Sequence, residues 1–89
     1  MTVSRTVEVT NRRGLHARAS AKFVTLASNL PTSVKVAKGD SEVMGTSIMG
    51  LMMLGAAKGD HITISADGDA AEDAVQAMCA LVEGKFGED

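Results

Sequence analysis

The chain has 89 residues, a mass of 9.2 kDa and a formal net charge of −2 at pH 7. This length predicts one small domain, residues 1–89, and excludes a second hydrophobic core. With 45% hydrophobic and 22% charged residues, the composition excludes intrinsic disorder, and the longest uncharged stretch, residues 43–57, is too short to span a membrane.

The positive charge gathers in the first half of the sequence. Residues 1–39 contain seven of the nine Lys and Arg residues, and Glu8 is their only acid. Arg12, Arg13, Arg18 and Lys22 form a cluster that would attract an anion, a phosphate or an acidic partner surface. We expect no nucleic-acid partner, because the chain is net negative and has two Phe residues as its only aromatic side chains.

The first half of the chain predicts a strand, a helix and a hairpin. Residues 2–10 alternate apolar and polar side chains around Val3, Val7 and Val9, a pattern that only Arg5 interrupts. A loop containing Gly14 leads into a helix over residues 17–28, which ends before Pro31. Two short strands follow, over residues 34–38 and up to Val43, joined by a turn at residues 38–40.

The second half predicts a helix, a strand and a last helix. Ser47 would cap a helix that ends near Gly55, and a strand follows over residues 61–66. We expect residues 67–69, Asp-Gly-Asp, to cap the last helix, whose apolar side chains recur at helical spacing from Ala70 to Val82. The resulting order, β-α-β-β-α-β-α, is typical of an α+β domain with helices packed on one face of an open sheet.

His16 is the residue best placed for chemistry. It lies where the Gly-containing loop meets the first helix, and the backbone N–H groups at a helix start favour anions. With Arg18 nearby, a phosphoryl group on the imidazole would meet both N–H and guanidinium donors, provided that the ring is accessible to partners. In the alternative interpretation, His16 only caps the helix and the arginines are solvated. We assign His61 no role, because a lone histidine at a strand start specifies little.

Two segments resemble a known family. GLHARASAKFV, residues 14–24, and TSIMGLMMLGAAKGDHITISADG, residues 46–68, are similar to the HPr family, the histidine-containing phosphocarriers of the phosphoenolpyruvate-dependent phosphotransferase system. The resemblance covers nearly the whole chain and implies an HPr-like open-faced β-sandwich, in which a four-stranded antiparallel sheet carries three helices on one face. It implies that Nδ1 of His16 accepts a phosphoryl group from phosphorylated Enzyme I and donates it to an Enzyme IIA-type domain, with assistance from Arg18. Such a protein is a stoichiometric carrier rather than an enzyme and uses no cofactor.

Two residues depart from the pattern of this family. Ala19 stands where the family commonly has a proline, which would preset the backbone angle at the helix start, and Arg13 replaces a small polar residue. The resemblance therefore leaves open whether the chain serves sugar transport or the nitrogen-related branch. An anion-binding module, or a purely regulatory module that passes no phosphate to a sugar permease, is the alternative function.

The helix after Ser47 suggests regulation and docking. Beyond its capping role, Ser47 matches the serine that HPr kinase/phosphorylase phosphorylates in relatives with the SIMG motif. The helix is apolar nearly all round, so part of it should be exposed to partners. We expect docking through Arg13, Lys22, Ile48, Met49 and Met52.

We also expect a cytoplasmic monomer, because no secretory signal is visible. We expect no metal site, because the chain has two distant His and one Cys, Cys79.

Overall fold

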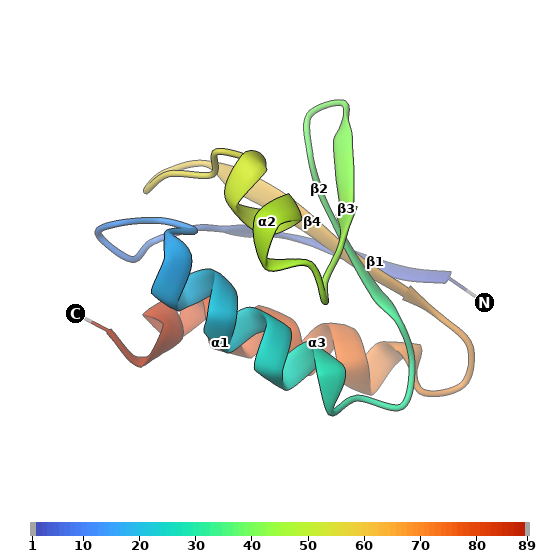
Figure 1. The fold of residues 1–89 in the computed structure, drawn as a ribbon. Helices are drawn as coiled ribbons and strands as arrows, with labels where there is room; N and C mark the ends of the chain where they lie inside the picture. The colour runs from blue at the N-terminus through green and yellow to red at the C-terminus, as the bar shows by residue number, and fades with distance from the viewer. Residues whose placement is uncertain (1, 89) are drawn as a thin grey trace.

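Strands and helices follow one another in the order that the sequence predicts. The computed structural model describes residues 2–88. The elements are β1 (Thr2–Glu8), α1 (Ala17–Ser28), β2 (Val34–Lys38), β3 (Ser41–Met44), α2 (Ile48–Met53), β4 (His61–Asp67), α3 (Ala71–Glu83) and the short 3-10 helix η1 (Lys85–Gly87) (Figure 1). None of the helices in residues 2–88 has the length and apolar character needed to cross a membrane.

The strands form one antiparallel sheet in the order β1-β4-β2-β3. The predicted hairpin of β2 and β3 is confirmed, and Gly39 occupies its turn with a φ of 59°, a left-handed conformation that favours glycine. Val7 of β1 lies opposite Ile62 of β4, and Val36 of β2 lies opposite Ile64 of the same strand. This register puts the apolar side chains of neighbouring strands on one face of the sheet.

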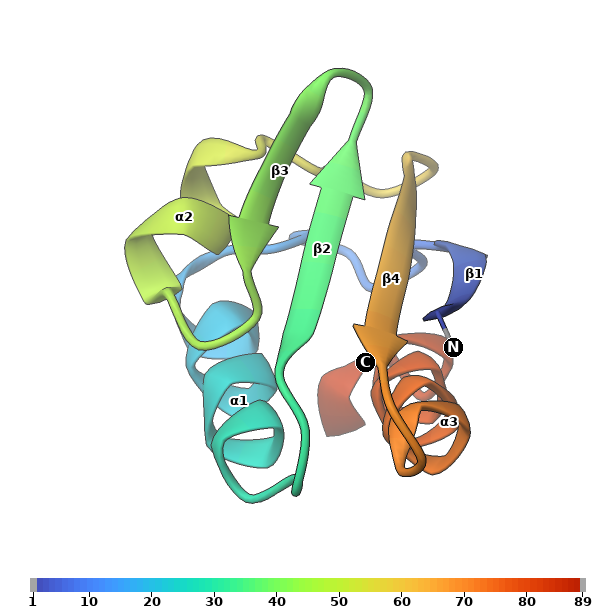
Figure 2. The same ribbon diagram turned by 90° about the vertical axis from the view of Figure 1, so that its right-hand side faces the viewer.

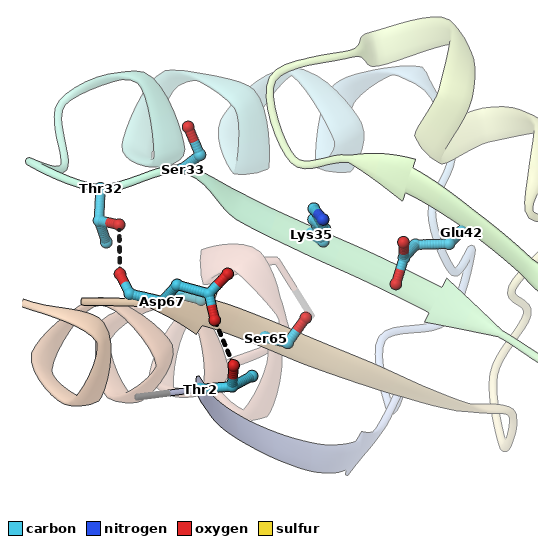
Figure 3. Close-up of a pocket in the computed structure, with 8 residues that line it drawn as sticks. Thr2, Thr32, Ser33, Lys35, Glu42, Ser65 and Asp67 are labelled. Carbon is cyan, nitrogen blue, oxygen red and sulfur yellow. Dashed lines mark hydrogen bonds between the residues drawn. The ribbon is translucent and has the colours of Figure 1, made fainter.

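The helices cover that apolar face, and the other face is open. Helices α1 and α3 run side by side beneath the sheet, and α2 lies next to the start of α1 (Figures 1 and 2). In α1, Ala19, Phe23 and Ala27 recur every four residues and are buried against the sheet. The open face is polar, and at one end of it Thr2 Oγ1 donates a hydrogen bond to Asp67 Oδ1 (Figure 3).

Arg5 lies on the helix-facing side of the edge strand β1, next to the thiol of Cys79 in α3. Burial raises the pKa of Cys79, and the neighbouring Arg5 guanidinium opposes that rise through its charge and a hydrogen bond. Cys79 is fully buried, so its thiol is part of the packed core. Arg5 interrupts the apolar alternation of β1, and the fold accommodates it because β1 is an edge strand of the sheet.

The predicted cap of the last helix is wrong. The N-cap of α3 is Ala70, with no side-chain capping bond, so residues 67–69 do not cap this helix. Asp67 is instead the last residue of β4 and accepts the hydrogen bond from Thr2. The acids that favour the helix start are Glu72 and Asp73, which lie in its first turn and interact with the helix dipole.

After α3 the chain turns back toward the start of α1. We call this segment, residues 85–88, the C-terminal strap. Lys85 and Phe86 adopt φ values of 58° and 57°, a left-handed conformation that costs about 1–2 kcal/mol for each non-glycine residue. Two contacts oppose that cost: the Phe86 ring is buried in the core, and Lys22 Nζ donates a hydrogen bond of 2.8 Å to the Phe86 carbonyl.

Candidate functional site

A tightly packed loop positions His16. Gly14 has a φ of 64°, and a Cβ atom at this position would lie 2.4 Å from the Ala56 carbonyl oxygen, so only glycine fits. Buried Asn11 donates a hydrogen bond of 2.8 Å to the Gly14 carbonyl, and Leu15 N–H donates one of 3.0 Å to Ala56 O. These contacts fix the backbone of the residue before His16 against the segment that follows α2.

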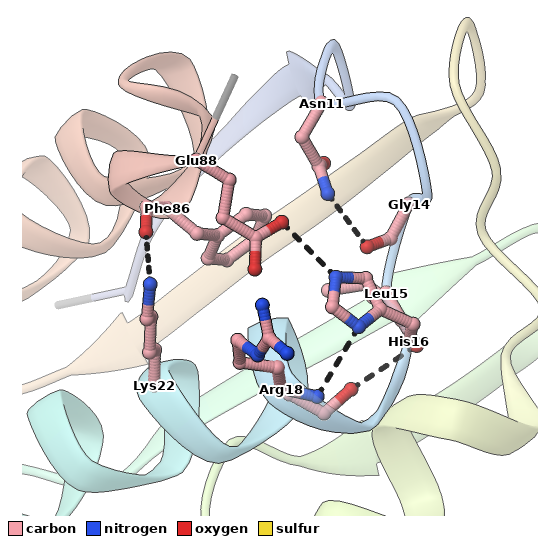
Figure 4. Close-up of polar contacts among 9 residues, drawn as sticks. Asn11, Gly14, Leu15, His16, Arg18, Lys22, Phe86 and Glu88 are labelled. Atoms are coloured by element: carbon pink, nitrogen blue, oxygen red, sulfur yellow. Dashed lines mark hydrogen bonds and ion pairs between the residues drawn. The ribbon is translucent and has the colours of Figure 1, made fainter.

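His16 is the N-cap of α1. Its backbone is extended, its carbonyl accepts the N–H of Ser20 at 2.9 Å, and its Nδ1 accepts the N–H of Arg18 at 3.2 Å. Buried Ser20 donates its hydroxyl to the Leu15 carbonyl at 3.2 Å, which ties the first turn of the helix to the loop. The imidazole therefore lies over the start of α1, where its Nδ1 caps the backbone N–H of Arg18 (Figure 4).

The two ring nitrogens of His16 have different partners. A backbone N–H can only donate, so Nδ1 accepts from Arg18 and carries a lone pair. Nε2 lies 3.0 Å from Glu88 Oε1, and a carboxylate can only accept, so Nε2 carries the proton. The hydrogen bonds thus assign the neutral Nε2–H tautomer, in which Nδ1 is the nucleophilic atom.

Positive charge surrounds the carboxylate that holds the ring. The hydrogen bond from His16 lowers the pKa of Glu88, partial burial opposes the change, and the nearby charges of Lys22 and Arg18 lower it further. Glu88 is therefore ionised at neutral pH. Its second oxygen, Oε2, is buried and has no hydrogen-bond partner within residues 2–88.

The imidazole of His16 is largely covered. The His16 side chain is only 16% exposed and that of Glu88 only 14%, because the C-terminal strap brings Glu88 against the Nε2 edge of the ring (Figure 4). The Nε2 edge of the imidazole is therefore covered by the Glu88 side chain. Arg18 is exposed, so its guanidinium is available to a ligand at the site.

The predicted docking residues occupy different environments. Arg13 is exposed in the loop before His16. Lys22 is partly buried, and its Nζ donates a hydrogen bond to the carbonyl of Phe86. It therefore supports the C-terminal strap as well as contributing charge beside the histidine.

Helix α2 places an apolar surface next to the start of α1. Ser47 is its N-cap, as predicted, and accepts the N–H of Gly50 at 2.9 Å. Leu51 and Leu54 are buried, whereas the other large side chains of α2, together with Met44 of β3, form an exposed apolar surface that we call the methionine surface. It consists of Met44, Ile48, Met49, Met52 and Met53, which are between 40% and 80% exposed.

Three features of the site were not predicted from the sequence. Asn11 could have been suspected, because a turn residue three positions before a glycine commonly bonds its own loop. Met53, the most exposed methionine of α2, follows from a helix that is apolar all round. Glu88 carries no local signal, since its contact with His16 depends on the path of the whole chain.

Within residues 2–88, no cluster of three or more His, Cys, Asp or Glu could hold a metal ion.

Comparisons with known proteins find relatives that match nearly the whole chain. The family described as "PTS HPr component phosphorylation site" matches residues 3–84. The chain is 49% identical over 86 residues to the phosphocarrier protein HPr of Neisseria meningitidis, covering 97% of each protein. It is 38% identical to the phosphocarrier protein NPr of Shewanella violacea, covering 97% of this chain and 94% of the relative.

A solved structure of HPr-C-His from Thermoanaerobacter tengcongensis superposes with a TM-score of 0.91 and 42% identity, covering 98% of both chains. The shared architecture confirms the predicted open sheet with three helices. Both the fold and the full-length sequence matches place the protein among the phosphocarriers. The chain belongs to the HPr family of the phosphotransferase system.

Proposed function

We propose that the protein accepts a phosphoryl group on Nδ1 of His16 from phosphorylated Enzyme I and donates it to an Enzyme IIA-type domain. The observation that supports this proposal is the tautomer of His16, whose Nδ1 lone pair lies over the start of α1 while the proton sits on Nε2. A neutral imidazole of this form is a nucleophile near neutral pH. The chain acts as a stoichiometric carrier.

The surroundings of Nδ1 suit a group that must arrive and leave. Phosphoryl oxygens at this atom would take over the N–H groups at the helix start, including that of Arg18, and would meet the exposed Arg18 guanidinium. Because these donors are few and partly solvated, they stabilise the phosphorylated form without trapping it. The first turn of α1 has the buried Ala19 at the position where a proline is common in the family.

The test is phosphorylation of the purified chain with labelled phosphoenolpyruvate and Enzyme I. We expect label that is acid-labile, alkali-stable and absent from His16→Ala. Folded wild-type protein that takes no label from an active Enzyme I would instead favour an anion-binding or purely regulatory module. Offering the labelled protein to acceptor domains of the sugar and nitrogen-related branches then identifies the acceptor.

We further propose that Ser47 is a regulatory phosphorylation site for an ATP-dependent kinase of the HPr kinase/phosphorylase type. Its hydroxyl caps a helix start, where a phosphate is tolerated, and it directly precedes the methionine surface. A phosphate there would place negative charge beside a docking face. Incubation with ATP and that kinase should give acid-stable phosphate in the wild type and none in Ser47→Ala; its absence from the wild type would reject this regulation.

We propose the methionine surface, with Arg13 and Lys22, as the docking face for these partners. Flexible methionine side chains adapt to several surfaces, and the basic residues beside His16 favour acidic ones. The protein would act as a cytoplasmic monomer that binds neither nucleic acid nor membrane. The burial of both Phe23 and Phe86 supports the exclusion of nucleic acid, because they are the only aromatic residues of the chain.

A further inference from the structure

We infer that Glu88 is a positioning residue for phosphoryl transfer and that the C-terminal strap exists to hold its carboxylate against Nε2 of His16. This inference rests on the proposed carrier function and adds a residue to it. It comes from a contact between residues 72 positions apart, His16 Nε2 and Glu88 Oε1 at 3.0 Å.

The strap is built to fix this contact. It turns through two left-handed non-glycine residues, Lys85 and Phe86, a conformation that persists only where the surroundings enforce it. The Phe86 ring is 1% exposed and anchors the strap in the core. The hydrogen bond from Lys22 Nζ to the Phe86 carbonyl ties it to the same helix that begins at His16 (Figure 4). These two contacts hold Phe86 in place and thereby position Glu88, two residues further along the chain.

Only one of the two carboxylate oxygens gains a hydrogen bond from this placement, because Oε1 accepts from His16 and Oε2 has no partner among residues 2–88. Leaving a charged oxygen buried without a hydrogen-bond partner costs free energy, and a functional task of the carboxylate would explain that cost. Lys22 and Arg18 supply positive charge nearby, and the pKa of Glu88 is lowered, so the group remains ionised. A fixed negative charge thus faces the proton-bearing edge of the imidazole.

This charge matters at the moment of transfer. Nδ1 attacks phosphorus, the new N–P bond forms, and the bond to the donor histidine breaks with its electron pair left on the donor nitrogen. Because Nε2 keeps its proton, the phosphorylated ring of His16 becomes cationic. The Glu88 carboxylate, 3.0 Å away, stabilises that developing charge and keeps the ring in the form that also releases the phosphoryl group readily.

The contact also determines which nitrogen is nucleophilic. Without an acceptor at Nε2, the ring could turn or move its proton to Nδ1, and the lone pair would no longer face the start of α1.

Three variants separate the acceptor from the charge. Glu88→Ala removes both acceptor and charge. Glu88→Gln keeps an acceptor oxygen but removes the charge. Glu83→Gln, at an exposed glutamate near the end of α3, is the matched control for loss of one negative charge.

The experiment combines proton–nitrogen NMR of the His16 imidazole, at a pH where the ring is neutral, with the rate of phosphorylation by Enzyme I. We expect the Nε2–H tautomer to dominate in the wild type, Glu88→Gln and Glu83→Gln, and to give way to a mixture in Glu88→Ala. Transfer should slow by roughly 10-fold in Glu88→Ala, less in Glu88→Gln and not at all in Glu83→Gln. Circular dichroism and thermal unfolding confirm that each variant is folded.

An unchanged tautomer in folded Glu88→Ala would overturn the inference, and so would an altered tautomer with wild-type transfer rates. The NMR measurement needs no phosphate donor, so it tests the contact independently of the carrier function. If the wild-type chain itself accepted no phosphate, the carrier proposal would fall and the transfer role of Glu88 with it, whereas the NMR result would still report whether Glu88 sets the tautomer.

Discussion

Gly14 packs directly against the carbonyl oxygen of Ala56. A Cβ atom at position 14 would lie 2.4 Å from that oxygen and 2.8 Å from the Cα of Ala57. The next residue, Leu15, bonds to the same carbonyl, and His16 follows at once. The placement of the histidine therefore depends on the absence of a side chain two residues before it.

Gly14→Ala should destabilise the fold and displace His16. We expect a loss of about 2–4 kcal/mol in the free energy of unfolding, from the left-handed backbone and the clash with Ala56 together. Gly39→Ala is the matched control, because Gly39 has a similar φ of 59° but open space around it, and it should cost only about 1–2 kcal/mol. Denaturant unfolding measures both; equal losses would mean that the Ala56 contact is not restrictive.

Ser47→Ala should remove the cap of α2. The hydroxyl accepts the Gly50 N–H at 2.9 Å, and loss of such a cap costs about 1 kcal/mol. Ser47→Thr should retain most of the stability, and Thr46→Ala, at the exposed neighbouring residue, should change it little. Thermal and denaturant unfolding of the three variants test this, and a Ser47→Ala protein as stable as the wild type would argue against a capping role.

Met49→Glu should weaken partner docking without unfolding the protein. The Met49 side chain is 68% exposed, so the substitution buries no charge in the free chain but places one on the methionine surface. We expect phosphoryl exchange with Enzyme I to slow by roughly 10-fold at limiting partner concentration. Gln76→Glu adds the same charge to an exposed position on α3 and serves as the control. Equal exchange rates in all three proteins would remove the methionine surface from the docking face.

Acid should release the C-terminal strap. The pKa of Glu88 is lower in the folded than in the unfolded chain, chiefly because of the hydrogen bond from His16. The contact therefore stabilises the fold at pH values above the ordinary pKa of a glutamate, and this contribution is lost as the pH falls through the lowered pKa. The stabilities of the wild type and Glu88→Gln should differ at neutral pH and converge in acid. A difference that persisted at acid pH would show that the charge of Glu88 is not its source.

Local patterns in the sequence predict most of the fold. Strands with alternating valines and isoleucines, the helical period of α1 and the hydroxyl of Ser47 before an apolar run each act over a few residues, so they can be interpreted without the tertiary structure. The cap of α3 was predicted wrongly because Asp67 has a competing partner, Thr2, at the far end of the chain. A nearby acid favours a cap only when no distant group binds it first.

The histidine site is predictable only on one side. The Gly14 turn, His16 and Arg18 are adjacent in sequence, so the helix-start half of the site follows from local rules. The other half consists of Glu88, whose approach depends on the left-handed turn at Lys85 and Phe86 and on the burial of the Phe86 ring. Neither Lys nor Phe favours a left-handed backbone conformation, so the sequence does not indicate this turn or the low exposure of His16 that results from it.

The most direct test of the account is to determine which ring nitrogen carries phosphorus. After phosphorylation with phosphoenolpyruvate and Enzyme I, phosphorus–nitrogen coupling in NMR spectra of the ¹⁵N-labelled protein distinguishes the two atoms. We predict phosphorus on Nδ1 of His16, with Nε2 still bearing its proton toward Glu88. Phosphorus on Nε2, or on a residue other than His16, would contradict the account.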